Sequence, residues 1–185
     1  MKELSLNILD IAQNSIKAGA SHIGVTLDET DETLSLSITD DGCGMTADVV
    51  RGVTDPFYTT RTTRSVGMGI PLLKLAAEQT GGSFSIESVS ELDDPSSHGT
   101  TVRAQFFKNH LDFTPLGDVV STVCTLIQGA PDVDWHFCHR RGADAVELDT
   151  AEMRAVLGDV PLDSFEVLDW IRQSLLEEYA GFNRQ

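Results

Sequence analysis

The chain has 185 residues, 41% of them hydrophobic, so it can build a core in one generous domain or in a main domain with a small appendage. Its formal net charge of −16 repels nucleic-acid phosphates, which argues against a general DNA- or RNA-binding protein. No segment approaches the length of a membrane-spanning helix, and the first residues lack a secretion signal, so we expect a cytoplasmic protein without a membrane partner.

In the first half of the main domain, apolar residues recur at helical spacing over residues 3–18, and Gly19 follows as a C-terminal stop. Residues 23–27 and 34–38 alternate apolar and polar side chains, as half-buried strands do. Thr46 is predicted to cap a short helix that ends near residue 51.

A second long helix is predicted over residues 68–79, with Gly81 and Gly82 ending it. Two further alternating strands are expected near residues 84–86 and 102–106. This order of elements favours an α/β (α+β) fold, namely a two-layer sandwich with helices on one face of a mixed sheet.

A boundary is expected near residues 109–115, giving a main domain over residues 1–108 and an appendage over 115–185. The appendage is predicted to have the order α-β-β-α-α. Its expected features are an amphipathic helix near 116–127, a hairpin over 133–148, and capping boxes at Asp149 with Glu152 and at Asp163 with Glu166. We expect it to serve packing or partner binding, including the possibility of a homodimer.

The cysteines and histidines carry little functional signal. Cys43, Cys124 and Cys138 are odd in number and widely spaced, which favours free thiols in a reducing compartment. His136 and Cys138 share one strand face with no fourth ligand in view, so we interpret them as structural and not as a metal site.

The first helix carries a polar stripe in addition to its apolar face. At 100° per residue, its members fall within an arc of roughly 80°: Glu3, Asn7, Asp10, Asn14 and Lys17. A solvated helix face is the ordinary explanation of such a stripe, and the motifs that follow favour a binding site instead.

Two glycine motifs lie downstream of this helix. Asp40-Asp41-Gly42-Cys43-Gly44 comes directly off a strand, where its glycines permit a sharp turn and close approach to a flat ligand. Gly67-Met68-Gly69 opens a helix, whose free N–H groups and dipole favour phosphate. Arg61 and Arg64 lie just upstream, in a polar segment that could cover a triphosphate. Each motif alone is common, and neither matches a Walker A loop or a Rossmann fingerprint.

Taken together, the motifs resemble those of the GHKL ATPase superfamily, which includes gyrase-type topoisomerases, mismatch-repair ATPases and sensor histidine kinases. Asn14-Ser-Ile-Lys-Ala-Gly-Ala20 is similar to the N box, Asp40-x-Gly42-x-Gly44 to the G1 box and Asp55-Pro-Phe57 to the F box. Gly67-x-Gly69 is similar to G2, and Gly99-Thr100 to the terminal Gly-Thr motif. The resemblance covers residues 1–107 and is strongest to the ATP-binding domain of histidine kinases.

The resemblance implies ATP and Mg²⁺ as cofactors, with Asn14 as the metal ligand and Asp40 reading the adenine amino group. Thr100 would lie beside Asp40, and Arg61 would meet the phosphates. The full set of cofactor-binding residues that it implies is Asn14, Lys17, Asp40, Gly42, Gly44, Met45, Arg61, Thr62, Gly67, Met68, Gly69, Ile70 and Thr100.

The sequence departs from the family pattern at two points. Asp10 occupies the position where a glutamate often activates the attacking water, so its catalytic role rests on a shorter side chain. The alternative register with Asn7 as the metal ligand is rejected, because only Asn14 continues into the N-box pattern. There is also no room before residue 1 for a helix pair carrying a phospho-acceptor histidine, so we do not expect a complete histidine kinase.

We therefore expect an ATP-dependent protein kinase that acts on a partner in trans, as anti-sigma-factor kinases do, or an ATPase. The alternative is a non-catalytic switch in which ATP orders a lid that a partner protein recognises.

Overall fold

The computed structural model describes residues 3–54 and 68–182 of the chain. Its strands form one mixed sheet in the order β3-β4-β2-β1-β5-β6, in which only the β1–β5 pair is parallel among the pairs described. In chain order the elements are α1 (Leu4–Lys17), β1 (His22–Glu29), β2 (Thr33–Asp40), α2 (Ala47–Val53), α3 (Gly69–Gln79), β3 (Ser83–Val89), β4 (Gly99–Phe107), α4 (Val119–Gly129), β5 (Asp134–Arg141), β6 (Asp144–Asp149), α5 (Thr150–Leu157) and α6 (Phe165–Phe182).

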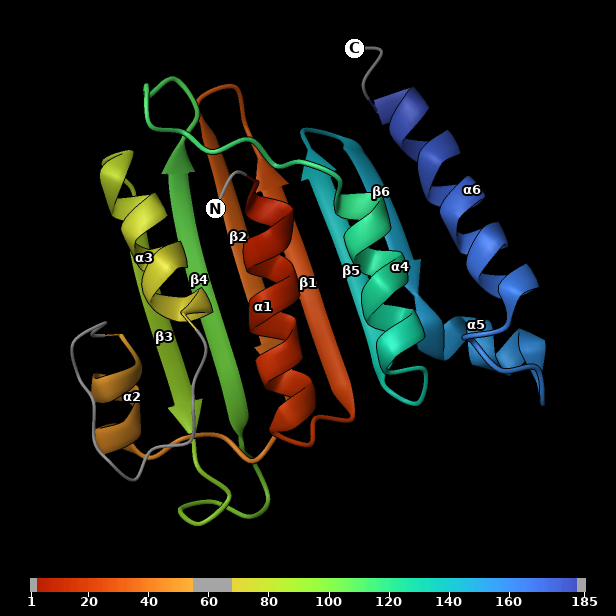
Figure 1. The fold of residues 1–185 in the computed structure, drawn as a ribbon, viewed down its shortest axis with the longest axis horizontal. Coiled ribbons are helices and arrows are strands. Elements are labelled where there is room, and N and C mark those ends of the chain that lie inside the picture. Colours follow the sequence, from red (N-terminus) through yellow and green to blue (C-terminus); the bar gives the residue numbers. More distant parts are fainter. Residues whose placement is uncertain (1–2, 55–67, 183–185) are drawn as a thin grey trace.

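Helices α1, α3 and α4 lie side by side over one face of this sheet, and α6 lies near the β6 edge (Figure 1). The predicted two-layer sandwich of helices on a mixed sheet is thus confirmed. Thr46 holds the N-cap position of α2 as predicted, but its side chain makes no capping hydrogen bond. Within the described ranges, no helix combines the length and the apolar character needed to cross a lipid bilayer.

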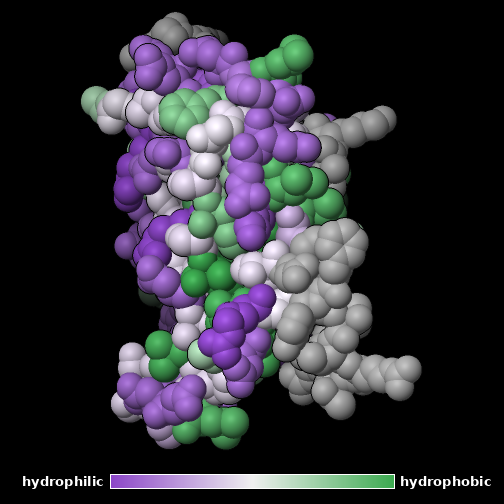
Figure 2. Space-filling model, turned by 90° about the vertical axis from the view of Figure 1, so that its left-hand side faces the viewer, coloured by the Kyte–Doolittle hydropathy of each residue, from purple (hydrophilic) through white to green (hydrophobic). Residues whose placement is uncertain are grey.

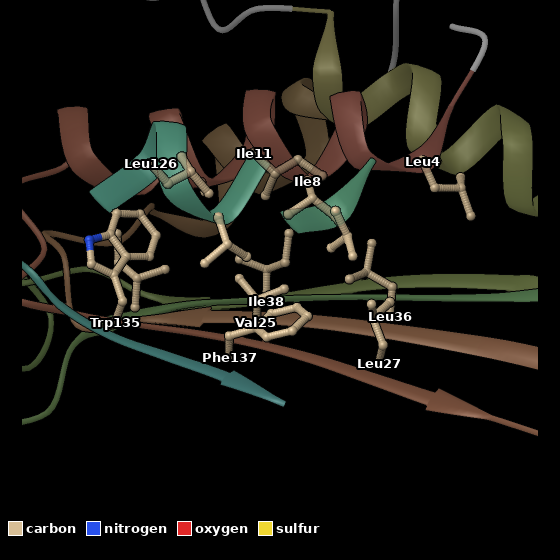
Figure 3. Packing of buried hydrophobic residues seen from close by; sticks show 14 of the residues in the cluster. Leu4, Ile8, Ile11, Val25, Leu27, Leu36, Ile38, Leu126, Trp135 and Phe137 are labelled. Atoms are coloured by element: carbon tan, nitrogen blue, oxygen red, sulfur yellow. The ribbon is translucent and has the colours of Figure 1, made fainter. Parts of the chain in front are cut away.

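The core lies between the helices and the sheet (Figure 3). Ile8 and Ile11 of α1 face Val25 and Ile38, which alternate along β1 and β2 with more exposed residues. All four side chains are at most 3% exposed. Burial of such a side chain contributes about 1.5–3 kcal/mol, so the period-3.6 and period-2 apolar patterns hold α1 against the sheet.

The opposite face of the sheet is built from small and polar side chains. Gly24, Thr26, Ser35 and Ser37 are half-buried and alternate with the core residues of β1 and β2. Seen from the α2 and β3 edge, hydrophilic residues line the side of the molecule turned away from the helices (Figure 2). This sheet can therefore leave one face to water, as antiparallel sheets commonly do.

Residues 115–185 have the predicted α-β-β-α-α order, and they continue the same sheet. Strand β5 pairs in parallel with β1 along its whole length, from His22 opposite Asp134 to Glu29 opposite Arg141. Their buried residues also belong to the same core cluster as those of α1 and β1. The division into domains at residues 108 and 115 stays a prediction, because two segments that share one sheet need not fold independently of each other.

A network of charged side chains ties this end of the sheet together. The Glu29 carboxylate, 13% exposed, accepts hydrogen bonds from Lys108 (2.6 Å) and Arg141 (2.9 Å). The buried ring of His139 joins Glu29 on one side (3.0 Å) and the Tyr179 hydroxyl on the other (2.9 Å). Since Glu29 can only accept, the His139 Nε2 donates to it and Nδ1 accepts from Tyr179. The network joins β1, β5, α6 and the segment after β4.

Candidate functional site

One edge of α1 carries the polar residues that the sequence singles out. Asp10 and Asn14 are half-buried and Lys17 is exposed, whereas Asn7 is only 1% exposed. Among the described residues, the Asn14 Nδ2 and Asn7 Oδ1 atoms are buried and have no hydrogen-bond partner. Leaving such an atom unsatisfied costs about 1–3 kcal/mol, so a ligand oxygen beside Asn14 would relieve a real penalty.

Asp10 lies directly against the start of α3. A Cβ atom added to Gly69 would be 2.9 Å from the Asp10 Cβ and 3.8 Å from its Oδ2. Only glycine allows α3 to begin this close to α1, which explains the residue type at position 69. The Asp10 carboxylate thus stands beside a helix N-terminus, where a negative charge interacts favourably with the helix dipole.

Asp40 ends β2, and its carboxylate is held from two sides. The Ser15 hydroxyl donates to Oδ2 (2.5 Å), and the main-chain N–H of Gly42 donates to Oδ1 (3.0 Å). Ser15 follows Asn14 on α1, so the strand end and the polar edge of α1 meet here. A carboxylate has about four acceptor positions, which leaves Asp40 able to accept further hydrogen bonds from a ligand.

The turn after Asp40 is packed so closely that its glycines have no room for a side chain. Gly44 has φ +65°, and a Cβ there would lie 1.8 Å from the Val89 carbonyl oxygen. A Cβ on Gly42 would be 2.9 Å from the Cβ of Ala18. The Cys43 main chain bonds to the end of α1 through the Ala18 carbonyl (2.9 Å). The turn is therefore closely packed between α1 and β3, with no space for side chains at its glycines.

Thr100 lies opposite Asp40 in the β2–β4 register, and Ser88 links it to the turn. The Ser88 and Thr100 hydroxyls are 2.8 Å apart, and Ser88 Oγ accepts from the main-chain N–H of Met45 (2.8 Å). Met45 itself is half-buried against the core. A serine of β3 thus links Thr100 and Met45, two of the residues that the resemblance implies for nucleotide binding.

Sequence reasoning missed the roles of Ser15, Ser88 and Asp41. Ser15 lies within the N box and could have been noticed, whereas Ser88 lies on a distant strand and gave no local signal. Asp41 accepts from the main-chain N–H groups of Ser21 (2.7 Å) and His22 (2.9 Å). Burial alone would raise the pKa of Asp41, but the hydrogen bonds from His22 and Ser21 outweigh it, so this pKa lies below its ordinary value.

Of the remaining residues that the sequence predicts for the site, the structure describes Ile70 and Met68 only. Ile70 is 4% exposed and belongs to the core, so only its main chain is available to a ligand, and Met68 is 61% exposed. Arg61, Thr62, Gly67 and the F box at Asp55-Pro-Phe57 lie outside the described residues.

The described residues fit a magnesium nucleotide at this place. Asn14 offers one amide to a cation that takes oxygen ligands and keeps several waters and phosphate oxygens around it. The first N–H groups of α3 have no intrahelical partner and suit phosphate. In the part of the chain that is described, no three His, Cys, Asp or Glu side chains gather into a metal site.

Helices on one face of a mixed sheet, with a glycine turn after an aspartate-ended strand, agree with the fold expected from the resemblance to GHKL ATPase domains. Residues 2–110 match the model of the histidine kinase-, DNA gyrase B- and HSP90-like ATPase family. The chain belongs to this family.

The individual relatives share only part of their length with the chain. The sensor histidine kinase ZraS of Escherichia coli O157:H7 is 31% identical over 84 residues, which are 44% of this chain and 18% of that protein. Sensor protein SrrB of Staphylococcus aureus is 31% identical over 93 residues, 48% of this chain and 16% of that protein. The chain thus spans less than a fifth of these curated relatives. The ATPase domain of Aquifex aeolicus MutL complexed with ADP has a TM-score of 0.55 at 12% identity, covering 96% of this chain and 70% of that one, which shows a shared fold.

Proposed function

We propose that this chain binds ATP with Mg²⁺, with the adenine at Asp40 and the phosphates between α1 and the start of α3. The Asp40 carboxylate carries the proposal, because Ser15 and Gly42 fix its orientation while leaving acceptor positions open. A carboxylate held in this way accepts from the exocyclic amine of adenine, and it repels the carbonyl oxygen that guanine has at the same place. The family match over residues 2–110 supports the assignment.

The phosphates would be held by groups of three kinds. Asn14 would contribute its amide oxygen to Mg²⁺, and the ion, when bound, neutralises phosphate charge. The N–H groups of Gly69 and Ile70 at the start of α3 would donate to phosphate oxygens. Lys17 lies one turn beyond Asn14 on α1 and would add a positive charge. Arg61, Thr62 and Gly67 are proposed from the family resemblance alone.

The proposed activity is transfer of the γ-phosphate to a protein partner in trans, or its hydrolysis. Asp10 would orient or deprotonate the attacking hydroxyl or water, because it stands beside α3 at the phosphate end of the site. The phospho-acceptor would come from another protein, and a homodimer through residues 115–185 stays a prediction.

A non-catalytic switch is the second candidate function. The position of Asp10 supports this candidate as well, because it gives Asp10 a structural role. A carboxylate beside the start of α3 stabilises that helix electrostatically, so Asp10 has a role there without any proton transfer. In this case ATP would order the chain for a partner, and turnover would be absent.

Isothermal titration with ATP and Mg²⁺ tests the binding proposal. We expect ATP to bind and GTP to bind at least about a hundredfold more weakly, because GTP leaves Asp40 facing an oxygen. Asp40→Asn should abolish ATP binding, while Asp28→Asn, exposed at the far end of the sheet, should leave it unchanged. Equal affinities for ATP and GTP would contradict the role of Asp40.

Incubation with γ-labelled ATP separates the two candidate functions. Label on a second protein indicates a kinase, free labelled phosphate an ATPase, and neither product a switch. Asp10→Asn should spare binding and remove turnover. If this variant turns ATP over at the wild-type rate, Asp10 is not the catalytic base.

A further inference from the structure

Helices α5 and α6 lie beside the β6 edge of the sheet (Figure 1). An apolar groove is lined by residues of α5, α6 and β6. Its volume is about 570 Å³, and Met153, Leu157 and Val167 form part of its lining. Val156 of α5 is 88% exposed and Trp170 of α6 is 58% exposed, and both line the groove. Large apolar side chains gathered around a hollow in this way are typical of a surface that binds a partner.

Carboxylates surround this apolar lining. Glu147, Asp149, Glu152, Glu166 and Glu178 all line the groove, and no lysine or arginine among the described residues does so. Asp149 caps α5 by accepting from the main chain of Ala151 and Glu152. His136 is the one basic group recorded beside them, with its ring within 3.5 Å of both Glu147 and Asp149.

The arginines of the two helices point elsewhere. Arg154 of α5 donates to Asp134 (2.8 Å) and to the Val133 carbonyl (2.9 Å), and Arg172 of α6 donates to the Ser121 hydroxyl (3.2 Å). Among the described residues the groove lining carries five carboxylates and no guanidinium, which gives the groove a negative field. Such a field attracts positively charged partners and repels acidic ones.

We propose that this groove binds a basic amphipathic helix of a partner protein. Its apolar stripe would lie on Val156, Met153 and Trp170, with lysines or arginines facing the carboxylates of α5 and α6. The proposal does not depend on nucleotide binding, because none of these residues belongs to the Asp40 site.

Two other occupants fit the groove less well. An added strand would need the free edge of β6, but there the main-chain N–H of Glu147 already donates to Glu178 of α6 (3.2 Å). A second copy of the chain, related by a twofold axis, would place the same five carboxylates against one another.

The test uses the full chain and two synthetic, fluorescein-labelled peptides as long as α6, which has 18 residues. Both peptides carry the same leucine stripe at helical spacing, one with lysines and the other with glutamates on the polar face. Fluorescence anisotropy should detect binding of the lysine peptide only, and its affinity should fall as salt is added. Equal binding of both peptides would overturn the proposal.

Paired variants separate the groove from the general acidity of the chain. Glu152→Gln with Glu166→Gln should weaken binding roughly tenfold, whereas Asp169→Asn with Glu177→Gln, exposed on α6 outside the groove lining, should change it less than about twofold. If both pairs weaken binding equally, the peptide binds through net charge and the groove assignment is wrong.

A second variant guards against loss of folding. Val156→Ser alters a side chain that is 88% exposed, and Leu111→Ser alters one that is 97% exposed away from the groove. If both variants keep the wild-type thermal unfolding temperature, only Val156→Ser should weaken binding of the lysine peptide. Should sedimentation instead show a wild-type dimer that only Val156→Ser dissociates, the occupant is a second copy and the proposal is wrong.

Discussion

Replacing Glu29 by glutamine removes the only anion recorded between Lys108, Arg141 and His139 in the described network. Burial alone would raise the pKa of Glu29, but the hydrogen bonds from Lys108 and Arg141 outweigh it and lower the pKa from 4.5 to about 2. A tenfold change in an equilibrium constant corresponds to about 1.4 kcal/mol, so this lowering of the pKa corresponds to roughly 3 kcal/mol of stability at neutral pH. Screening by solvent around the partly accessible carboxylate reduces this contribution to nearer about 2 kcal/mol.

The pH dependence follows from the direction of this shift. Because the folded pKa lies below the unfolded one, the contribution of Glu29 is fully present above about pH 4.5 and is lost as the pH falls toward about 2. We expect the free energy of unfolding of the wild type to exceed that of Glu29→Gln by about 2–3 kcal/mol at neutral pH, and this gap to narrow below about pH 4.5.

Urea unfolding followed by tryptophan fluorescence, at several pH values from neutral down to about pH 3, measures this gap directly. Glu87→Gln is the control, since Glu87 pairs with Arg103 at 3.2 Å but both side chains are more than half exposed, and its effect should stay below about 1 kcal/mol. A gap between wild type and Glu29→Gln that keeps the same width from neutral to acidic pH would refute the reasoning.

Three further predictions follow from single residues. Burial lowers the pKa of His139 below 6.5, so wild-type stability should decline as the pH falls through 6.5, and His139→Gln should lack that decline in urea unfolding. Gly44→Ala should lower the free energy of unfolding by several kcal/mol, whereas Gly142→Ala, which also has a positive φ but nothing within 4 Å of a new Cβ, should cost about 1 kcal/mol. Ser15→Ala should weaken ATP binding by roughly three- to tenfold in calorimetry, because it frees Asp40 Oδ2, while Ser5→Ala at the other end of α1 should not.

Each of these has a clear contrary outcome. A His139→Gln variant with the wild-type pH profile would show that the buried ring does not titrate differently on folding. Equal costs for the two glycine variants would mean that the turn after Asp40 yields easily. Unchanged ATP affinity in Ser15→Ala would remove this hydroxyl from the site.

Much of the fold could be predicted because local sequence patterns specify its helices, strands and turns. The period of apolar residues predicted α1 and the strands β1 and β2, since each period fixes which face of an element is buried. The turn residues near Gly142 predicted the hairpin of β5 and β6. The Asp40 turn was also visible, because positive φ and close packing demand glycine at position 44. These signals need no knowledge of distant contacts.

What the tertiary structure alone decided is which elements meet. An apolar face does not name its partner, so nothing in the sequence showed that β5 would pair in parallel with β1, or that Ser88 would join Met45 to Thr100. The Glu29 network and the acidic groove arise in the same way, from side chains that are remote in sequence and close only in the folded chain. The sequence by itself determined the elements and the motifs of an ATPase domain, because short-range sterics and periodicity specify them. Their assembly into a fixed carboxylate, a charged network and a groove depended on long-range packing, which local patterns do not encode.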